Sequence, residues 1–566
     1  MDYRLSLAHI NDTHSHFDPS EIRFTLKDND HSYQLQTTTG GYNRIEQYKN
    51  QLAHQANEDN TPFLFLHGGD CFQGTLYFSY FKGKANSHLL NILQPDAMVI
   101  GNHDIDGGNQ EFAKFAADVN FPILAGNMDL SGEQPKEYPL KGLANLYDYD
   151  HQQQRAKYII KDFYDTKLAI VGLTIEHMPQ IATPDPDTEF HNAAQVAQAT
   201  IKHLHQQGIK HIIVLSHLGI VDDRILAQQV DGISLIVGGH SHTQQGDLRP
   251  LGFNTHLPYA EKVNDAVIVH AGKYAEVLGH GQFQFDKSGK VTKVAGNNYF
   301  LVAPPYKIKR ANKWCAATPD KIHQLHAMEN IIEISTVGEI EKQLELHYRP
   351  VIEDMSRNAI DFFPVSLCHQ RLPSKSKPQG STLAPIVAQG FYYACQINGF
   401  KIDAAIHNAG GVRNSIPAGS VTEADIAGKI LPFAIPLVRL KISGQHLTQA
   451  LESAIDHAYN NGVQGTGTGS FPYCYNLKYH YRGNAPMGQR LSIQIWRNDD
   501  WQPLQPQQDY FIVCSSYTAS GKEGYQALLN NQGKLTLPIN MAESFILFLQ
   551  KNTVSLSEHK GIEVEF

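Results

Sequence analysis

The chain has 566 residues, too many for a single hydrophobic core and enough for two substantial domains. Its 47 basic and 56 acidic residues give a formal net charge of −9, so no global positive field attracts it to nucleic acid or anionic lipid. No stretch is apolar over the roughly 18 residues that a membrane helix requires. We therefore expect neither a nucleic-acid partner nor a membrane partner.

The N-terminal segment MDYRLSLAHINDTHSHFD lacks the basic region, apolar segment and small-residue cleavage site of a secretory leader. The six cysteines are scattered without a C-x-x-C pair, which is typical of small buried apolar residues in a reducing compartment. We expect a cytoplasmic protein, or a periplasmic or secreted one if a leader has been trimmed from this sequence. The oligomeric state is left open.

Residues 1 to about 300 repeat one pattern. Short runs rich in Val, Ile and Leu end abruptly in polar clusters, as buried strands of a parallel sheet do. These runs are RLSLAHI (4–10), PFLFLHG (62–68), AMVIG (97–101), HIIVLS (211–216) and GISLIVGG (232–239). Helix-like stretches lie between them, at 39–58, 108–119 and 192–208. This alternation predicts an α/β fold with polar residues at the carboxyl ends of strands, where open α/β sheets bind ligands.

Each polar cluster alone has an ordinary explanation, because Gly-Asp and Asn-His pairs are common in turns. Together the clusters supply Asp12, His14, Asp70, Asn102, His103, His217, His240 and His242. A dinuclear metal site needs a bridging carboxylate and enough nitrogen and oxygen donors for both ions, with open positions for water and a phosphoryl oxygen. The set predicts two divalent metal ions, and this donor mix suits Zn, Mn, Co or Fe better than Ca.

Five motifs, NDTHSH, GGDCFQG, GNHDID, SHLG and GGHSHT, match in order those of calcineurin-like metallophosphoesterases. With its additional C-terminal region the chain resembles the 5'-nucleotidase family, of the bacterial UDP-sugar hydrolase/5'-nucleotidase type. The resemblance implies an α/β protein in which an N-terminal metallophosphoesterase αββα sandwich is followed by a smaller α/β C-terminal substrate-binding domain.

The resemblance also implies roles for individual residues. The expected metal ligands are Asp12, His14 and His242 for one ion and Asn102, His217 and His240 for the other, with Asp70 as the bridge. His103 would be catalytic, with Asp106 orienting its ring, and Asp104 is expected to be a surface or turn carboxylate. The family commonly has glycine at the position of Ser15, and serine is small enough to leave the site intact.

After residue 300 the pattern changes. YFLVAPPYKIKR closes the first domain, and a polar, helix-permitting stretch follows it. We expect a metallophosphoesterase domain at 1–325, a linker or hinge at 326–358, and the substrate-binding domain at 359–566.

In the second domain the resemblance, more than the residues themselves, points to a substrate site. The implied substrate-binding residues are Asn408, Arg413, Phe433, Tyr517 and Glu523. Glu523 stands where the family usually has aspartate. An upstream family motif, R-x-x-E-x-x-x-G-N-L, is replaced by RLPSKSKPQGSTLAP, in which Arg371, Lys375 or Lys377 would have to supply the cation. The alternative for the two aromatic residues is ordinary core packing.

The leading hypothesis is hydrolysis of nucleoside 5'-phosphates to nucleoside and phosphate by a water activated between two metal ions, with base and ribose held by the second domain. Within the same class, the alternatives are a 2',3'-cyclic phosphodiesterase with 3'-nucleotidase activity and a nucleotide-sugar pyrophosphatase. From another class, the chain could be a non-catalytic nucleotide-binding protein, which would have no need of the His103 and Asp106 pair.

Overall fold

The structure is a computed structural model that describes residues 3–28, 31–310, 313–463, 465, 467–551 and 561–565. The chain divides into two compact units. Unit 1 comprises residues 1–73 and 81–349, and unit 2 comprises residues 74–80 and 350–566. Of the described helices, none is long and apolar enough to cross a membrane.

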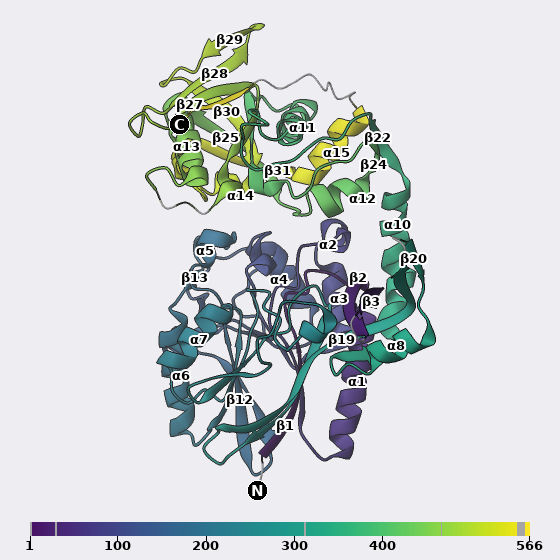
Figure 1. Ribbon diagram of the computed structural model, residues 1–566. Coiled ribbons are helices and arrows are strands. Elements are labelled where there is room, and N and C mark those ends of the chain that lie inside the picture. The colour runs from purple at the N-terminus through teal and green to yellow at the C-terminus, as the bar shows by residue number, and fades with distance from the viewer. Residues whose placement is uncertain are drawn as a thin grey trace. The chain divides into compact units, whose positions relative to one another are not determined.

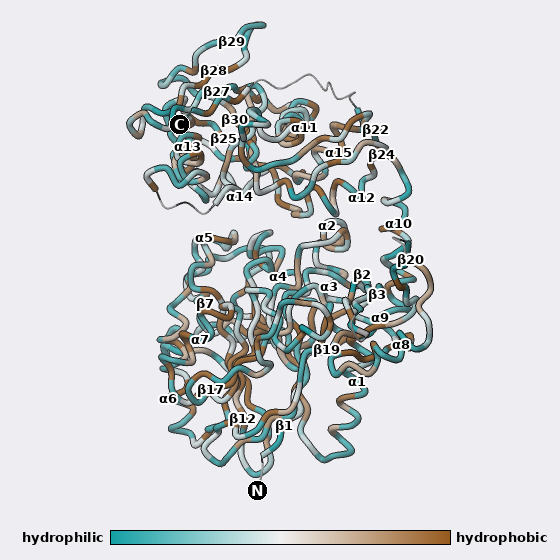
Figure 2. The backbone as a smooth tube through the Cα atoms, viewed as in Figure 1, coloured by the Kyte–Doolittle hydropathy of each residue, from teal (hydrophilic) through white to brown (hydrophobic). Residues whose placement is uncertain are grey.

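Unit 1 is built on two sheets that pack face to face. The first has the order β2-β3-β19-β18-β1-β4-β5-β6-β8, with β20 and β21 paired to β19. The second has the order β11-β12-β14-β15-β17-β16. Apolar side chains from both sheets, among them Leu7, Leu66, Ile170 and Leu215, form one buried cluster between them. In Figure 2 the strands at the centre of this unit are the most hydrophobic part of its trace.

The first sheet consists of β1 (Tyr3–Ile10), β2 (Ser20–Asp28), β3 (His31–Thr39), β4 (Phe63–His67), β5 (Ala97–Val99), β6 (Ile123–Leu124), β8 (Leu146–Tyr147), β18 (Val277–Phe285), β19 (Val291–Arg310), β20 (Lys313–Ala316) and β21 (Ile331–Glu333). The second consists of β11 (Tyr158–Phe163), β12 (Thr166–Leu173), β14 (His211–Ser216), β15 (Leu235–Val237), β16 (Glu261–Val263) and β17 (Ala266–Val269). Two small pairings, β7 (Met128–Asp129) with β13 (Glu189–Phe190) and β9 (Tyr149–Asp150) with β10 (Arg155–Ala156), lie outside these sheets.

Helices cover the outer faces of both sheets, which gives unit 1 its four layers (Figure 1). The α-helices of this unit are α1 (Tyr42–Glu58), α3 (Lys84–Leu93), α4 (Asn109–Asp118), α5 (Met178–Ile181), α6 (Ala193–Gln206), α7 (Ile220–Gln229), α8 (Pro319–His326) and α9 (Glu339–Gln343). The three helix-like stretches expected from the sequence correspond to α1, α4 and α6. Asn192 caps α6 by accepting a hydrogen bond from the Gln195 amide, 3.0 Å away.

Unit 2 has its own core around a five-stranded sheet of order β26-β23-β30-β25-β31. A second sheet, β29-β28-β27-β32, and the pair β22-β24 complete its strands. The strands are β22 (Ala359–Phe363), β23 (Ala404–Asn408), β24 (Gly419–Thr422), β25 (Pro436–Ser443), β26 (Pro472–Tyr475), β27 (Leu477–Arg482), β28 (Leu491–Arg497), β29 (Asp500–Pro503), β30 (Asp509–Ser515), β31 (Gly533–Asn540) and β32 (Ile562–Glu565).

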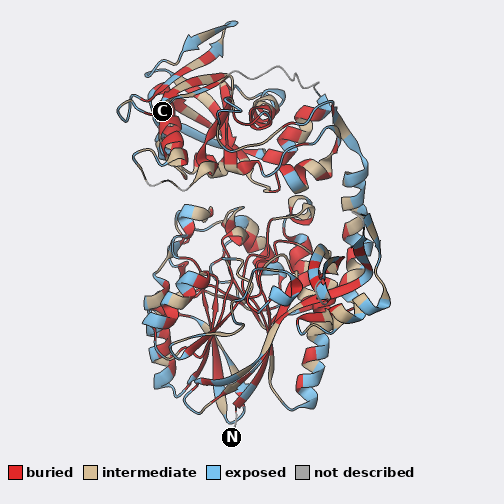
Figure 3. Ribbon diagram, viewed as in Figure 1, coloured by how far each residue is buried: buried red, intermediate tan, exposed pale blue. Residues whose placement is uncertain are grey.

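The helices of unit 2 are α2 (Leu76–Phe81), α10 (Arg349–Arg357), α11 (Ala384–Ile397), α12 (Glu423–Asp425), α13 (Gly444–Tyr459), α14 (Ser516–Ala519) and α15 (Met541–Lys551). Most of α2 is grouped with unit 2 although the sequence places it inside the first domain: the Ser79 hydroxyl donates to the carbonyl oxygen of Ala427 at 3.2 Å. Figure 3 shows α11 and α13 with buried inner faces.

The cysteines follow the sequence expectation only in part. All six are free thiols, and Cys71, Cys395, Cys474 and Cys514 are buried. Cys315, however, is exposed on the strand β20, and Cys368 is half-buried. The expectation that every cysteine is a buried apolar residue is therefore wrong for these two.

Candidate active site

The predicted metal ligands all follow the carboxyl ends of strands in unit 1. β1, β4 and β5 run parallel in one sheet, and β14 and β15 run parallel in the other. The loops after these strands carry Asp12 and His14, Asp70, Asn102, His217, and His240 and His242, respectively. Because parallel strands end at the same edge of a sheet, the two sheets together bring these residues into one place.

Three of the side chains converge as a first group of potential metal ligands. One ligand atom from each of Asp12, His14 and His242 lies within 4.8 Å of the others. The Nε2 atoms of His14 and His242 are 3.1 Å apart, and His242 Nε2 is 3.5 Å from Asp12 Oδ1. Two imidazole nitrogens that face each other at this distance suit a shared cation between them.

Asp70, His217 and His240 form a second group with the same spacing. His217 Nε2 lies 3.2 Å from Asp70 Oδ2, and His240 Nδ1 lies 2.9 Å from the amide oxygen of Asn102. Asp70 Oδ2 is also 3.9 Å from His14 Nε2 in the first group. One carboxylate oxygen therefore faces both groups, as a bridging ligand would.

The orientation of two imidazole rings leaves their Nε2 atoms for a metal. Nδ1 of His14 lies 3.1 Å from the Phe72 carbonyl oxygen, and Nδ1 of His217 lies 2.6 Å from that of Gly68. A proton on Nδ1 that is donated to a carbonyl leaves Nε2 as the lone-pair nitrogen. His217 Nε2 is fully buried and makes no well-formed hydrogen bond, so a cation would satisfy it.

The backbone at these residues adopts conformations that L-amino acids rarely occupy. The angle φ is 50° at Asp12, 47° at His14, 55° at Asp70, 72° at His240 and 53° at His242. Left-handed backbone costs a non-glycine residue about 1–3 kcal/mol and concentrates at functional sites. Five ligand candidates that share this strain indicate that the fold holds their side chains in place against local preference.

Burial dominates the electrostatics of the two carboxylates. It raises the pKa of Asp12 to about 7. Burial also opposes ionisation of Asp70, but the imidazoles of His217 and His103 outweigh it and hold the Asp70 pKa well below its usual range. Two buried acidic groups among several histidines form a site whose charge a divalent cation would balance.

His103 and Asp106 form a close pair beside these groups. His103 Nδ1 lies 2.5 Å from Asp106 Oδ2, and the backbone amide of His103 donates to Asp70 Oδ1 at 2.8 Å. Burial lowers the pKa of His103, but the nearby carboxylates of Asp106 and Asp70 outweigh it and raise that pKa to about 10. The ring keeps 31% of its side-chain surface exposed, so a substrate can reach it.

Asp104 is not the surface or turn carboxylate expected from the sequence. Only 1% of its surface is exposed. One oxygen accepts hydrogen bonds from the amides of Cys71 and Phe72, and the other from those of Asp70 and Gly101, at 2.8–3.1 Å. Asp104 thus fixes the loop that carries Asp70, a role that no sequence motif signalled.

Several predicted substrate residues lie together in unit 2. Nδ2 of Asn408 is 3.5 Å from Glu523 Oε2, and the Asn408 amide oxygen accepts from Thr518 at 3.2 Å. Glu523 has a left-handed backbone with φ of 52°. Burial raises the pKa of its carboxyl, while hydrogen bonds from Asn408 and the charge of Arg371 oppose that rise.

The two aromatic residues of this set are each covered by a cation. The guanidinium of Arg413 lies 5.5 Å from the centre of the Phe433 ring, and the Lys522 ammonium lies 5.1 Å from that of Tyr517. Both rings are half-buried, unlike the core aromatics of this unit. Of the cations in the segment that replaces the upstream motif, Arg371 lowers the pKa of Glu523 through its charge. The Lys377 ammonium instead donates to the Cys368 sulfur at 2.7 Å.

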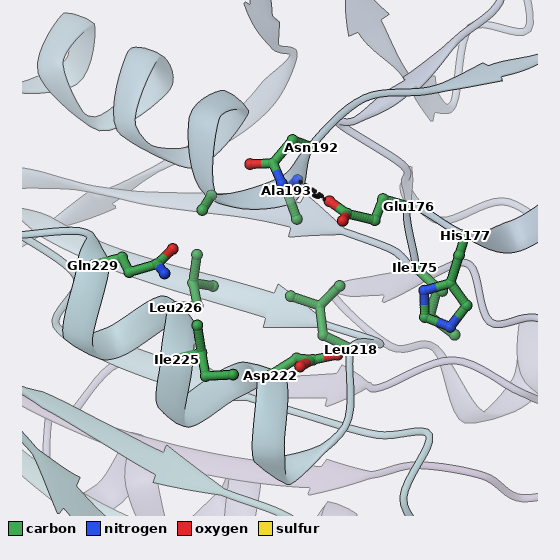
Figure 4. A pocket seen from close by; sticks show the side chains of 11 residues that line it. Ile175, Glu176, His177, Asn192, Ala193, Leu218, Asp222, Ile225, Leu226 and Gln229 are labelled. Atoms are coloured by element: carbon green, nitrogen blue, oxygen red, sulfur yellow. Dashed lines mark hydrogen bonds between the residues drawn. The ribbon is translucent and has the colours of Figure 1, made fainter. Parts of the chain in front are cut away.

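A pocket in unit 1 is lined by none of the predicted site residues, although one of its lining residues directly follows a predicted metal ligand in the sequence (Figure 4). Leu218, which follows His217, lines it together with Ile225 and Leu226 of α7. At its rim the carboxylate of Glu176 accepts from the backbone amide of Ala193 at 3.3 Å. We assign this pocket no part in the chemistry, because no predicted metal ligand or catalytic residue lines it.

Comparison with known families agrees with the geometry. Residues 5–244 match the calcineurin-like phosphoesterase model, and residues 367–530 match the 5'-nucleotidase C-terminal domain. The two-sheet unit with its strand-end ligands is therefore a metallophosphoesterase domain, followed by a second α/β domain, and the predicted fold class is confirmed.

Individual relatives cover nearly the whole chain. A probable 5'-nucleotidase of Treponema pallidum is 29% identical over 97% of this chain and 92% of its own length. An NAD 5'-nucleotidase of Haemophilus influenzae is also 29% identical, over 97% of this chain and 90% of its own length. The crystal structure of a 5'-nucleotidase precursor from Thermus thermophilus matches with a TM-score of 0.67 and 26% identity, covering 100% of this chain and 99% of that one. The chain belongs to the 5'-nucleotidase family.

Proposed function

We propose that the protein is a metal-dependent phosphohydrolase that converts nucleoside 5'-phosphates to nucleoside and phosphate. The observation that carries this proposal is Asp70, whose Oδ2 faces two groups of ligand atoms, at 3.2 Å from His217 Nε2 and 3.9 Å from His14 Nε2. Membership of the 5'-nucleotidase family supports the same reaction class.

We assign the metal ligands accordingly. Asp12, His14 and His242 would hold one divalent ion, Asn102, His217 and His240 would hold the other, and Asp70 would serve both. The ions are Zn, Mn, Co or Fe, because imidazole and carboxylate donors suit these metals. When bound, such a pair lowers the pKa of a water and offsets charge on the phosphoryl oxygens. The buried Nε2 of His217 and the facing nitrogens of His14 and His242 fit this assignment.

His103 acts on the substrate in this proposal. Asp106 keeps the Nδ1 proton of His103 hydrogen-bonded, so Nε2 is the ring nitrogen that would act on the phosphate ester. A protonated ring there stabilises charge on a phosphoryl or leaving oxygen. The carboxylates of Asp106 and Asp70 raise the pKa of His103, which favours the protonated ring. A non-catalytic nucleotide-binding protein would not need this pair.

Unit 2 supplies nucleoside recognition. In this proposal Asn408 and Glu523 bind ribose hydroxyls, Phe433 and Tyr517 stack on the base, and Arg413 binds an anionic group. Arg371 is our assignment for the cation of the missing upstream motif, because its charge acts on Glu523. Base-aromatic stacking contributes about 1–3 kcal/mol with little regard to the identity of the base, so broad base tolerance is expected.

A substrate panel on the purified full chain tests the function. AMP, UMP, 2',3'-cyclic AMP, a UDP-sugar, NAD and an aryl phosphate are compared with Zn, Mn or Co added, and phosphate release is measured. NAD is included because one relative is named an NAD 5'-nucleotidase. We expect the highest kcat/KM with nucleoside 5'-phosphates and complete loss of turnover with a chelator. Nucleotide binding without hydrolysis of any substrate would overturn the proposal.

The aromatic pair has its own test. Phe433→Ala and Tyr517→Ala should each raise KM for AMP by roughly 5–150-fold, the equivalent of 1–3 kcal/mol, and leave aryl phosphate hydrolysis nearly unchanged. Phe471, which is completely buried, provides the matched control. Phe471→Ala should cost about 3–5 kcal/mol of stability and affect every substrate equally. If the Phe433 and Tyr517 variants behave like the control, both rings are core residues.

A further inference from the structure

A third cluster of imidazole and carboxylate groups lies in unit 1 and shares no residue with the candidate active site. One ligand atom from each of Asp129, Glu189 and His191 lies within 4.8 Å of the others. A second histidine, His151, extends the cluster: its Nδ1 lies 2.7 Å from Asp129 Oδ2. Nothing in the nucleotidase reaction as proposed above uses these four residues.

The centre of this cluster is Asp129, on the short strand β7. Only 3% of its surface is exposed. Its Oδ2 faces Nδ1 of His151 at 2.7 Å and Nε2 of His191 at 3.1 Å, and its Oδ1 accepts from the Ser131 amide at 2.7 Å. Two imidazole nitrogens therefore converge on one buried carboxylate oxygen. The His191 distance of 3.1 Å falls within the 3.1–3.9 Å that separate ligand atoms in the candidate active site, and the His151 distance of 2.7 Å is shorter.

The pairing of β7 with β13 brings two carboxylates into opposition. Asp129 and Glu189 are direct partners across this antiparallel ladder. Side chains of direct partners lie on the same face, about 4.5–5.5 Å apart at Cβ, and like charges in such positions repel each other. A dication bound between the two carboxylates would offset this repulsion.

The backbone around the cluster is fixed by independent hydrogen bonds. The His191 amide donates to the carbonyl oxygen of Asn127 at 2.8 Å, and the Asn127 side chain donates back to the His191 carbonyl at 3.0 Å. Asn127, which is fully buried, also bonds both backbone groups of Thr174. The ring of His191 packs against Tyr149, with centroids 4.3 Å apart. These contacts fix the position of His191 in the cluster, whereas Glu189 and His151 are exposed.

We propose that Asp129, Glu189, His191 and His151 form a zinc site separate from the nucleotidase centre. Imidazole nitrogens and carboxylate oxygens are both ligands of Zn²⁺, which takes four of them in a tetrahedral arrangement at structural sites. The site would tie together three segments that are distant in sequence, namely β7, β13 and the turn between β9 and β10. Asp129 and Glu189 lie on the two-stranded pair β7 and β13, outside both main sheets, so the ion would be structural. The competing explanation is that Asp129 serves only as a hydrogen-bond acceptor for two histidines.

The test compares zinc stoichiometry between variants of the full chain. Each protein is stripped with a chelator, equilibrated with buffered Zn²⁺, freed of unbound metal and analysed for zinc by mass spectrometry. His191→Gln and His151→Gln remove one ligand each, and the 66% exposed side chain of His151 makes its loss harmless to folding. The control is His54→Gln on α1, an exposed imidazole 3.7 Å from the Glu58 carboxylate.

We expect each ligand variant to bind one zinc equivalent fewer than the wild type, and His54→Gln to bind the wild-type amount. Added zinc should raise the thermal midpoint of the wild type more than that of either ligand variant. Hydrolysis of an aryl phosphate should be unchanged in all three variants. Equal zinc content in the wild type and both ligand variants would overturn the proposal. Because the readout is a difference in bound metal, it does not depend on whether the nucleotidase assignment is correct.

Discussion

Asp104→Asn is the sharpest perturbation of the candidate active site that leaves every proposed metal ligand in place. The Asp104 carboxylate accepts four backbone hydrogen bonds, from Asp70, Cys71, Phe72 and Gly101. Asparagine keeps one oxygen and turns an NH₂ group toward the other two amides. Two buried N–H groups then lose their acceptor, at about 1–3 kcal/mol each, so we expect a loss of about 2–6 kcal/mol.

Part of this loss should appear as weaker metal binding, because three of the four amides belong to the loop that carries Asp70. Urea unfolding gives the free energy of unfolding, and metal analysis after dialysis against buffered Zn²⁺ gives the occupancy. Asp286→Asn is the control: Asp286 accepts from the Ser288 and Lys290 amides in an exposed hairpin turn, where water can replace it. Wild-type metal content in Asp104→Asn, with a loss below about 1 kcal/mol, would refute this reasoning.

Three further predictions concern the active site and the second domain. Asp70→Asn should lower metal content and abolish hydrolysis, because a neutral amide is a poor bridge between two dications; full activity would contradict the dinuclear assignment. His103→Asn should retain both metals while turnover falls by about 10²–10⁴-fold, and loss of metal would make His103 a ligand. Burial lowers the pKa of His407 to about 3, so between about pH 6.5 and that value only the unfolded chain takes up a proton at this residue. The free energy of unfolding therefore decreases as the pH is lowered, by at most about 1.4 kcal/mol per pH unit. Thermal melts from pH 7 to 4 should show a shallower decline for His407→Phe than for the exposed control His323→Gln, and parallel curves would contradict this.

The sequence predicted the strands and their polar ends because both signals are local. Uniformly apolar runs identify buried parallel strands, and the side chains just after β1, β4, β5, β14 and β15 must then share one edge. The structure brings six of those residues together in two groups, each within 4.8 Å, and places the Asn102 amide oxygen 2.9 Å from His240 Nδ1. The functional roles of the individual residues remain predictions.

What the sequence did not reveal depends on contacts between distant segments. The sequence indicated a turn carboxylate at Asp104, because three of its four hydrogen-bond donors come from a loop some thirty positions earlier. The Asp129 cluster was invisible because β7 and β13 are two residues long and show no periodicity. The grouping of residues 74–80 with unit 2 depends on contacts such as that between Ser79 and Ala427, 348 positions apart.

Ser15, where the family commonly has glycine, allows the backbone strain at the active site to be measured. Its φ of 55° is left-handed, a conformation that costs a non-glycine residue about 1–2 kcal/mol. Its hydroxyl compensates, because it donates to the Cys71 carbonyl at 3.1 Å and accepts from the Asn86 amide at 3.0 Å. At about 0.5–1.5 kcal/mol each, these bonds roughly offset the strain.

Glycine at this position removes both the strain and the hydrogen bonds, whereas alanine removes only the hydrogen bonds. We therefore expect Ser15→Gly to unfold in urea within about 1 kcal/mol of the wild type, and Ser15→Ala to be about 1–3 kcal/mol less stable. Metal content should be unchanged in Ser15→Gly, since the flanking ligand His14 keeps its bond to the Phe72 carbonyl. Equal stabilities for the glycine and alanine variants would show that the left-handed backbone carries no cost here. The two hydrogen bonds of the Ser15 hydroxyl would then offset no backbone strain.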